Sequence, residues 1–497
     1  MEESKTFKTF WLVVLSGFGF FVQFISAPFI ARALTVFENG IYHQVVLVTD
    51  VFFLFLALGF HNVVLIYLRR TDYNKYEVFW TSFLFLKTVG LLGVITIYFS
   101  APYIDMHYNA NGQLTTLLRI YSVFLIFKLP MAATEAAFIL FGRTKSIVKR
   151  NLILSIFNTC LLIFAVQYFK TVEALVYALT INSFTSYTIS FLLVPKEFKH
   201  KIKLSRDYFN KQITDGFALG FNNIVGRLSI IIDKLIISSL MSPAVFAVYR
   251  NGAIEVPFFS SIYRTISNMA IPEMSHLLSI NKSDKIVELK KKIIGSTALI
   301  VYPVMIFLVL FAKEFITIYL SDKYINSAPV FRIFALTLIF RINAHSDILM
   351  ANRKYKTVIK SSIILLTVTA LTSYILIYLY GIIGGALAYF AMVMTSTLLL
   401  LNFSAKSINR SLIDFFNMRD LLSISGVSIS VAALIMILPI NLMLWYNFLM
   451  VFVLYGIIVY TILLKFFITD LTVIKNILNK VNIKGHNLGH YFEKVFG

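Results

Sequence analysis

The sequence predicts an all-α polytopic membrane protein with about 14 transmembrane helices. Hydrophobic residues make up 58% of the 497 residues and charged residues only 14%, and the mean hydropathy is +0.80. Apolar runs of about 20 residues, the length at which a helix crosses a bilayer, recur along the whole chain. Together these features place the chain among membrane proteins with many spans.

The ends of the spans follow from the polar or basic clusters that close each apolar run. The expected spans cover residues 10–34, 41–68, 78–100, 114–141, 152–169, 172–194, 217–240, 245–275, 294–310, 330–350, 358–380, 382–402, 424–438 and 444–464. The three tryptophans, Trp11, Trp80 and Trp445, fall near span ends, where an amphipathic ring prefers the headgroup region. The first run imitates a secretory signal but is too long for one.

The basic residues divide the loops into two sets. Alternate loops and both tails carry 31 Lys and Arg residues, whereas the opposite loops carry only Lys170, Lys313 and Lys323. Because Lys and Arg avoid translocation, we expect both termini to be cytoplasmic. This partition explains most of the net charge of +21 and therefore predicts topology, not a nucleic-acid partner.

Several other functions lack their motifs in this chain. We find no Gly-rich phosphate loop with its Lys, no helix with two His at metal spacing and no nucleotide-binding fingerprint. We therefore expect no cofactor, no bound metal and no ATPase of its own, and the lone Cys160 excludes a disulfide framework. The longest loops, residues 196–215 and 276–292, are basic and amphipathic, so we expect them to lie on anionic membrane lipids.

A faint internal repeat predicts how the spans are grouped. Residues 34–42, between spans one and two, resemble residues 240–249, between spans seven and eight, and an acid follows early in each next span, Asp50 or Glu255. We expect two six-helix lobes in pseudo-repeat plus two C-terminal helices. The expected domains are an N-lobe at 1–211 with its basic cytoplasmic loop, a C-lobe at 212–405, and spans 13–14 with a basic tail at 406–497.

Several short segments carry a resemblance to a known group. They are Ala31-Arg32-Ala33-Leu34 followed by Glu38-Asn39-Gly40-Ile41-Tyr42, then Asp233-Lys234-Leu235-Ile236-Ile237 leading to Val248-Tyr249, and the outer Ile318-Tyr319-Leu320-Ser321-Asp322-Lys323-Tyr324. With the fourteen-span layout, they resemble the polysaccharide-transporter branch of the multidrug/oligosaccharidyl-lipid/polysaccharide exporter superfamily. That branch includes the O-antigen flippases (Wzx) and is related to the lipid II flippase.

The resemblance implies a function without covalent chemistry, so the chain is not expected to be an enzyme. It implies a flippase in the bacterial inner membrane that moves an undecaprenyl-pyrophosphate-linked oligosaccharide from the cytoplasmic to the outer leaflet. The family fold has two six-helix lobes around a cationic cavity, with spans 13 and 14 often forming a groove for the lipid tail. A polysaccharide polymerase and the chain-length machinery are the protein partners that this role implies.

Basic side chains inside the expected spans predict the substrate-binding residues. Lys87, Lys128, Arg227 and Arg341 fall near span centres, where an unpaired cation costs roughly 3 kcal/mol or more. Arg250 and Arg264 are fourteen residues apart on span eight and return to nearly the same helical face. We expect these six to line a cationic cavity, because Arg pairs bidentately with phosphate oxygens.

Three further arginines leave two interpretations open. Arg32, Arg119 and Arg332 lie within a turn or two of the outer boundary, where a long basic side chain reaches the headgroups. They either anchor their helices at the membrane surface or contribute to substrate binding.

The acids inside the spans also have two interpretations. They are Asp50, Glu135, Asp233, Glu255, Glu273 and Asp347. They act either as counter-ions for the buried cations or as sites for a coupling proton or sodium ion. Asp50, Asp233 and Glu255 are the candidates for such a coupling site.

Two alternative functions remain at this point. A cation-coupled multidrug antiporter of the same superfamily usually has twelve spans and acids facing its cavity, whereas the spans here are net positive. A polysaccharide polymerase or ligase needs a long outer loop with Arg or His, and the outer segment 101–113 carries only His107.

Overall fold

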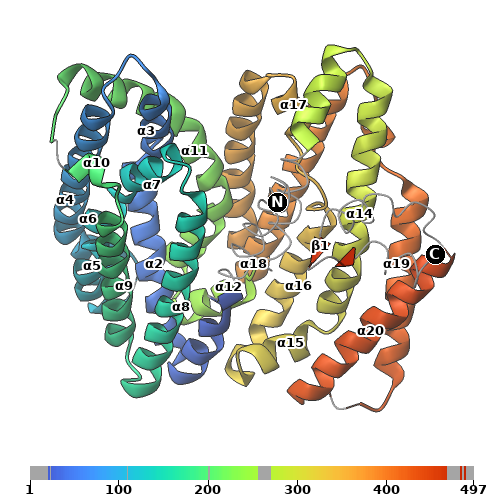
Figure 1. Ribbon diagram of the computed structural model, residues 1–497. Coiled ribbons are helices and arrows are strands. Elements are labelled where there is room, and N and C mark those ends of the chain that lie inside the picture. Colours follow the sequence, from blue (N-terminus) through green and yellow to red (C-terminus); the bar gives the residue numbers. More distant parts are fainter. Residues whose placement is uncertain are drawn as a thin grey trace. The chain divides into compact units, whose positions relative to one another are not determined.

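The computed structural model describes residues 21–22, 24–108, 110–199, 202–255, 270–440, 442–466, 482–483 and 486–487. The chain divides into two compact units, coloured along the sequence in Figure 1. We call the described residues of 18–250 and 369–385 the first-half unit, and those of 251–368 and 386–497 the second-half unit. The expected lobe boundaries at residues 211 and 405 stay a prediction.

The first-half unit is built of helices. Within the described residues, an apolar helical stretch at Phe24–Ala33 precedes the other helices. It is followed by α2 (Val36–Ala57), α3 (Phe60–Arg69), α4 (Lys75–Tyr108), α5 (Gln113–Ser122), α6 (Phe124–Lys128), α7 (Met131–Leu140), α8 (Thr144–Tyr168), α9 (Val172–Leu192), α10 (Lys196–Lys199), α11 (Arg206–Leu240) and α12 (Pro243–Gly252), whose end passes into the second-half unit.

The second-half unit is also helical. Residues 270–279 are helical, and they are followed by α14 (Ser283–Leu310), α15 (Ala312–Tyr319), η1 (Asp322–Ser327), α16 (Ala328–Leu336), η2 (Thr337–Ile339), α17 (Asp347–Ala351), both ends of α18 (Tyr355–Lys406), η3 (Leu412–Phe415), α19 (Met418–Ile437) and α20 (Trp445–Phe466). A two-residue antiparallel pair joins β1 (Asn482–Ile483) to β2 (His486–Asn487), with Ile483 opposite His486.

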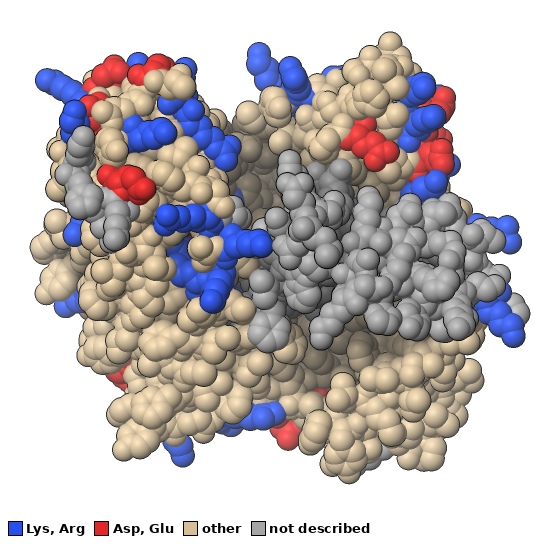
Figure 2. All heavy atoms as spheres, in the orientation of Figure 1, with Lys and Arg blue, Asp and Glu red and all other residues tan. Residues whose placement is uncertain are grey.

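The helix lengths fit a membrane protein with many spans. Eight helices in the described part of the chain are long and apolar enough to cross a bilayer. In the space-filling view charged side chains gather at the upper end, a further group of Lys and Arg lies at mid-height of the first-half unit, and a wide uncharged band lies below that group (Figure 2). The expected all-α membrane architecture is thus confirmed, while the full number of 14 spans stays a prediction.

Helix α18 contains two of the expected spans. Its 52 residues would extend about 78 Å at 1.5 Å per residue, more than twice the hydrocarbon thickness. Gly381 has φ 59° and ψ −136°, a backbone conformation that favours glycine, and it breaks the helix between the spans expected at 358–380 and 382–402.

Other expected spans are broken inside. The second span is divided between α2 and α3 at Leu58 and Gly59, and Leu58 has a φ of 40°. The fourth is divided into α5, α6 and α7, with Pro130 before α7. The tenth is divided into α16, η2 and α17, with non-helical backbone at residues 340–346.

Glycines allow α11 to contact the break between α2 and α3 directly. The Gly59 N–H donates to the Gly216 carbonyl at 3.2 Å, and a Cβ on Gly220 would lie 2.4 Å from the Gly59 nitrogen. A methyl group at Gly220 therefore has no room unless the backbone moves. Gly59 and Gly220 therefore serve the close packing of α11 against the break between α2 and α3.

One side chain lies in a different environment from the one its sequence neighbours indicate. The sequence places Lys290 in a cytoplasmic loop with Lys291 and Lys292, before a span that starts near residue 294. In the structure α14 begins at Ser283, and the Lys290 side chain is completely buried. The helix extends because its apolar face continues back through Ile286, and Asp347 offsets the buried ammonium.

Candidate functional site

Three predicted basic residues share one carboxylate in the first-half unit. Arg227, Arg250 and Lys128 each interact electrostatically with Asp50. They come from α11, α12 and α6, whereas Asp50 lies on α2. Since three cations face one acid, this group has an excess of positive charge, and we call it the Asp50 cluster.

Two tyrosines lie beside the Asp50 cluster. Tyr42, on α2, interacts electrostatically with both Arg250 and Asp50, and Tyr121, on α5, interacts with Asp50 and Tyr42. The Tyr121 ring stacks on Phe124 with 4.7 Å between ring centroids. Hydroxyl groups next to cations suit a ligand that carries both phosphate and sugar, because they donate and accept hydrogen bonds.

The second-half unit contains a different arrangement around Arg341. Its guanidinium forms an ion pair with Glu255 at 3.0 Å, and a second nitrogen lies 3.5 Å from the other carboxylate oxygen. The Tyr389 hydroxyl is hydrogen-bonded to both Arg341 and Glu255. Its ring stacks on Phe334 with 4.4 Å between centroids.

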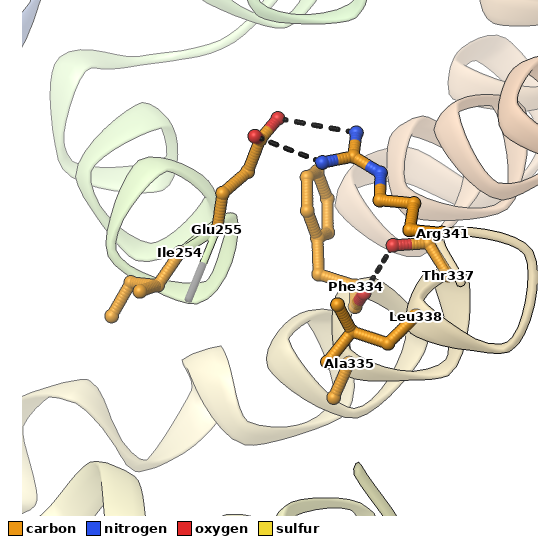
Figure 3. A pocket seen from close by; sticks show the side chains of 7 residues that line it. All are labelled: Ile254, Glu255, Phe334, Ala335, Thr337, Leu338 and Arg341. Atoms are coloured by element: carbon orange, nitrogen blue, oxygen red, sulfur yellow. Dashed lines mark hydrogen bonds and ion pairs between the residues drawn. The ribbon is translucent and has the colours of Figure 1, made fainter. Parts of the chain in front are cut away.

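Figure 3 shows the small pocket around this ion pair. Its lining residues are Ile254, Glu255, Phe334, Ala335, Thr337, Leu338 and Arg341. Arg341 reaches Glu255 across the pocket, while the Thr337 hydroxyl donates to the Phe334 carbonyl at 2.6 Å. The Arg341 side chain is 17% exposed and the Glu255 side chain 44%, so the carboxylate is the more accessible partner of the pair.

The two arrangements occupy matching positions in the two halves of the sequence. Arg119 donates to the Tyr98 carbonyl at 3.2 Å, and Arg332 donates to the Val309 carbonyl at 2.9 Å. Lys128 follows Arg119 by nine residues, and Arg341 follows Arg332 by nine residues. In both halves the second cation lies at the break of the helix, so the internal repeat extends to the side chains.

The outer arginines hold neighbouring helices together. Arg119 also lies over the Tyr98 ring, 4.4 Å from its centroid. Because their guanidinium groups bond to carbonyls of the preceding long helix, α4 or α14, both arginines fasten the start of the fourth or tenth expected span. Arg32 is exposed on the short first helix.

The remaining predicted residues are placed separately. Lys87 is exposed on α4, with its ammonium 6.0 Å from the centroid of the Tyr187 ring. Asp233 is buried on α11, where its carboxylate lies 3.3 Å from the Lys234 ammonium and accepts a hydrogen bond from Tyr249. Arg264 lies outside the described residues.

The other acids have different surroundings. Glu135 pairs with Arg150 at 2.9 Å, and Arg150 also donates to Ser190 at 3.1 Å. Glu273 is exposed. Asp347 pairs with Lys290, and both side chains are completely buried.

Sequence reasoning missed Lys290, Tyr389 and His345 as members of the polar interior. Lys290 lies in a run of lysines, but it also falls at helical spacing with Ile286, Ile294 and Thr297, all of which are buried. That helical spacing could have identified Lys290 as part of a buried helix face. No comparable signal marks Tyr389 among the 26 tyrosines of the chain.

The described residues hold no group of three or more His, Cys, Asp or Glu side chains suited to a metal ion. The buried polar groups of the described interior include charged pairs, hydroxyls and amides. Such groups bind, orient and exchange ions or protons, and they fit a transporter.

Comparisons with known proteins agree with this architecture. Residues 29–329 match the model of a family described as polysaccharide biosynthesis protein. The chain is 21% identical over 374 residues to the capsular polysaccharide biosynthesis protein CapF of Staphylococcus aureus, a match that covers 73% of this chain and 90% of CapF.

Among solved structures, similar folds occur in two kinds of transporter. The lipid II flippase MurJ, in an inward closed conformation, matches with a TM-score of 0.65 and 18% identity, over 91% of this chain and 96% of that one. An inward-facing multidrug resistance MATE family transporter of the MOP superfamily matches with a TM-score of 0.56 and 15% identity, over 80% of this chain and 94% of that one. At these identities the likeness concerns the fold.

Proposed function

The chain belongs to the polysaccharide biosynthesis protein family, and on that premise we propose that it is a flippase for an anionic, lipid-linked oligosaccharide. The substrate is an undecaprenyl-pyrophosphate-linked repeat unit of an O-antigen, capsule or exopolysaccharide. The protein moves it from the cytoplasmic to the outer leaflet of the bacterial inner membrane, with both of its termini in the cytoplasm.

The Asp50 cluster is the observation that carries this proposal. Three cations around one carboxylate leave two positive charges in excess, when all four groups are ionised. A pyrophosphate diester carries two negative charges, so the cluster and the head group match in sign and number. A cationic drug has the same sign as this excess charge and is repelled by it.

The physical task of the protein supports the same substrate class. A pyrophosphate and its sugars cannot enter hydrocarbon, because burying charge without compensation costs many kcal/mol. Fixed arginine and lysine side chains replace the lost hydration, and a guanidinium pairs with two phosphate oxygens at once. The apolar tail has no such cost and stays in the lipid.

The transport cycle follows from these parts. Open to the cytoplasm, the protein captures the head group on Lys87, Lys128, Arg227, Arg250, Arg264 and Arg341. Movement of the lobes then presents the head group to the outer side, where it leaves. Entry of a proton or sodium ion, with Asp50, Asp233 or Glu255 as its site, resets the protein.

The relatives favour this class of substrate. CapF is named for capsular polysaccharide biosynthesis and MurJ for flipping lipid II, a lipid-linked saccharide. A polysaccharide polymerase and the chain-length machinery are the expected partners downstream, since they consume lipid-linked repeat units at the outer face. The surrounding membrane lipids contact the wide uncharged band.

A cation-coupled multidrug antiporter is the second candidate, favoured by the fold that the chain shares with a MATE transporter. The Asp50 cluster disfavours it, because its excess charge repels a cationic drug. A polysaccharide polymerase or ligase needs a long outer loop with Arg or His, and the expected outer segment 101–113 carries only His107.

Translocation by the purified protein in liposomes tests the proposal. The liposomes contain an undecaprenyl-pyrophosphate-linked saccharide and carry a proton or sodium gradient, and a membrane-impermeant enzyme reports which leaflet holds the saccharide. We expect protein-dependent movement that is lost in the variants Arg227→Ala and Arg341→Ala. Lys360→Gln, which removes an exposed lysine of α18, is the matched control and should transport normally.

Two results would overturn the proposal. If the double variant Arg227→Ala/Arg341→Ala moves the saccharide at the wild-type rate, the assignment of these cations is wrong. If the wild-type protein moves no saccharide but expels a small organic dye in exchange for cations, the protein is a multidrug antiporter.

A further inference from the structure

The non-helical segment at residues 340–346 carries chemistry that the proposed function does not use. Among its backbone carbonyls, that of Ala344 accepts from the Lys290 ammonium at 2.8 Å, and that of His345 accepts from the Ser404 hydroxyl at 3.1 Å. Irregular backbone at membrane depth requires partners of this kind, because no water is present to supply them. The segment is therefore held firmly by α14 and α18.

Hydrogen bonds determine which ring nitrogen of His345 carries its proton. The Thr397 hydroxyl lies 3.0 Å from Nε2 of His345, and it donates its single hydrogen to the Val393 carbonyl at 2.8 Å. We assign the hydroxyl hydrogen to the Val393 contact, which makes Nε2 the donor in the contact with Thr397. The neutral ring consequently carries its hydrogen on Nε2 and a lone pair on Nδ1.

The Nδ1 atom of His345 is buried and has no hydrogen-bond partner among the described residues. The nearby buried pair does not provide one, because the Lys290 ammonium already donates to both Asp347 oxygens, at 2.7 and 2.5 Å, and to the Ala344 carbonyl. Both side-chain polar atoms of Asn343, a residue only 1% exposed, are also without a partner within the described chain. A buried lone pair without a partner is costly, and Nδ1 is the atom at which this ring can accept a proton once a negative charge compensates it.

The charges around His345 connect it to the pocket at Arg341. Burial of the ring, and after it the positive charges of Lys290 and Arg341, oppose a proton on His345 as long as no anion is present. Asp347 balances Lys290, and Glu255, with the Tyr389 hydroxyl, balances Arg341. A proton on the ring adds one positive charge to this balanced group, and an anion bound at Arg341 supplies the charge that compensates it.

We propose that His345 is a proton acceptor that takes up one proton from bulk water when an anionic head group binds at Arg341, and releases it when the head group leaves. This inference rests on the proposed function, since it requires the anion at Arg341. The ring gains one proton and one positive charge, and no bond of the substrate changes. By linkage, a proton on His345 strengthens anion binding by the same factor.

Proton uptake on binding tests the inference directly. The probe is a citronellyl-pyrophosphate-linked disaccharide, a pyrophosphate diester whose two phosphate charges do not change near neutral pH. Calorimetric titration of the full-length protein, in two buffers of equal pH and different ionisation enthalpy, gives the number of protons taken up. We expect uptake in the wild type, its loss in His345→Gln, and unchanged uptake in the control His107→Gln, which alters an exposed histidine of α4.

The outcomes separate this inference from the proposed function. Binding without proton uptake in the wild type, a result that needs no variant, overturns the role of His345 and leaves the flippase proposal intact. Uptake that persists in His345→Gln overturns it as well. If the wild-type protein does not bind the probe, the proposed function fails and the inference fails with it.

Discussion

The fourth and tenth expected spans are two versions of one element. Each starts with an arginine bonded to a carbonyl of the preceding long helix, and each carries a second cation nine residues later, at its break. Lys128 shares Asp50 with two arginines, whereas Arg341 has Glu255 and Tyr389. The first half therefore carries excess positive charge, and the second half balances its cation.

The difference continues toward the other end of the two spans. With the offset of 213 residues that relates Lys128 to Arg341, Asp347 corresponds to Thr134 and His345 to Ala132. Counted from the helix starts, an alignment that differs from this offset by five residues, Lys290 is the eighth residue of α14 and Ser82 is the eighth residue of α4. The first half has a neutral network there, in which Ser82 is hydrogen-bonded to Tyr208 at 2.9 Å.

This contrast suggests a division of labour within the proposed cycle. The Asp50 cluster has three cations and one acid. It binds an anion more strongly than a balanced pair does, because the anion does not have to displace an acid from every cation. A balanced pair next to an imidazole instead responds to the anion by exchanging a proton. The two halves thus share one arrangement of helices, and their different side chains give them different functions in the proposed cycle.

The largest expected effect concerns the stability of the buried pair. Replacing Lys290 by Met or Asp347 by Asn leaves one group buried without its partner, which costs about 3–5 kcal/mol of folding free energy. The double variant Lys290→Met/Asp347→Leu should recover most of that loss, because no charge is left unpaired. Thermal unfolding in detergent, monitored by size-exclusion chromatography, compares the stability of these single and double variants with that of the wild type.

The first half supplies the control for that experiment. Ser82→Ala and Thr134→Val remove neutral hydroxyls at the corresponding positions, and each should cost only about 1 kcal/mol. If the single variants at Lys290 and Asp347 are no less stable than these two, the buried pair does not hold the second half together. The two halves would then differ in sequence at these positions, but not in how much those residues stabilise the fold.

The next effect concerns transport and the pairing of Arg341. Removing one partner of a charged hydrogen bond costs about 1.5–3 kcal/mol, so Arg341→Gln should slow translocation roughly 10- to 100-fold. Part of that loss comes from the Glu255 carboxylate that remains. The double variant Arg341→Gln/Glu255→Gln should therefore transport faster than Arg341→Gln.

The same pair of changes in the first half should give the opposite result. Lys128→Gln leaves Arg227 and Arg250 facing Asp50, so adding Asp50→Asn removes a carboxylate that still has two cations. We expect no rescue of translocation in Lys128→Gln/Asp50→Asn. Equal rescue in both halves would show that the two clusters do not differ in charge balance.

Parts of this organisation were accessible from the sequence. The break at Gly381 separates two spans that the length of the apolar run distinguishes, because that run is too long for one crossing, and Lys128 and Arg341 stand out because a cation in the middle of an apolar run is expensive. The pairing of Arg341 with Glu255 was not accessible, since the two residues are 86 positions apart and only the packing of helices joins them. Lys290 was missed because a run of lysines looks like a solvated loop.

The smallest expected effect concerns the outer arginines, where the two halves agree. Arg119 and Arg332 each donate one exposed hydrogen bond to a backbone carbonyl, which stabilises by about 0.5–1 kcal/mol. Arg119→Gln and Arg332→Gln should therefore each lower stability slightly and slow translocation less than about fivefold, by similar amounts. Unfolding and liposome translocation, measured side by side with Arg341→Gln, check this.

A large loss of translocation in only one of the outer variants would change the interpretation of these positions. If Arg119→Gln abolishes movement of the saccharide while its stability stays normal, Arg119 binds substrate in the half that already has excess positive charge. The substrate-binding residues would then extend nearer to the outer face in the first half than in the second. Equal, small effects instead place the functional difference between the halves at and beyond the helix breaks, where Lys128 and Arg341 lie.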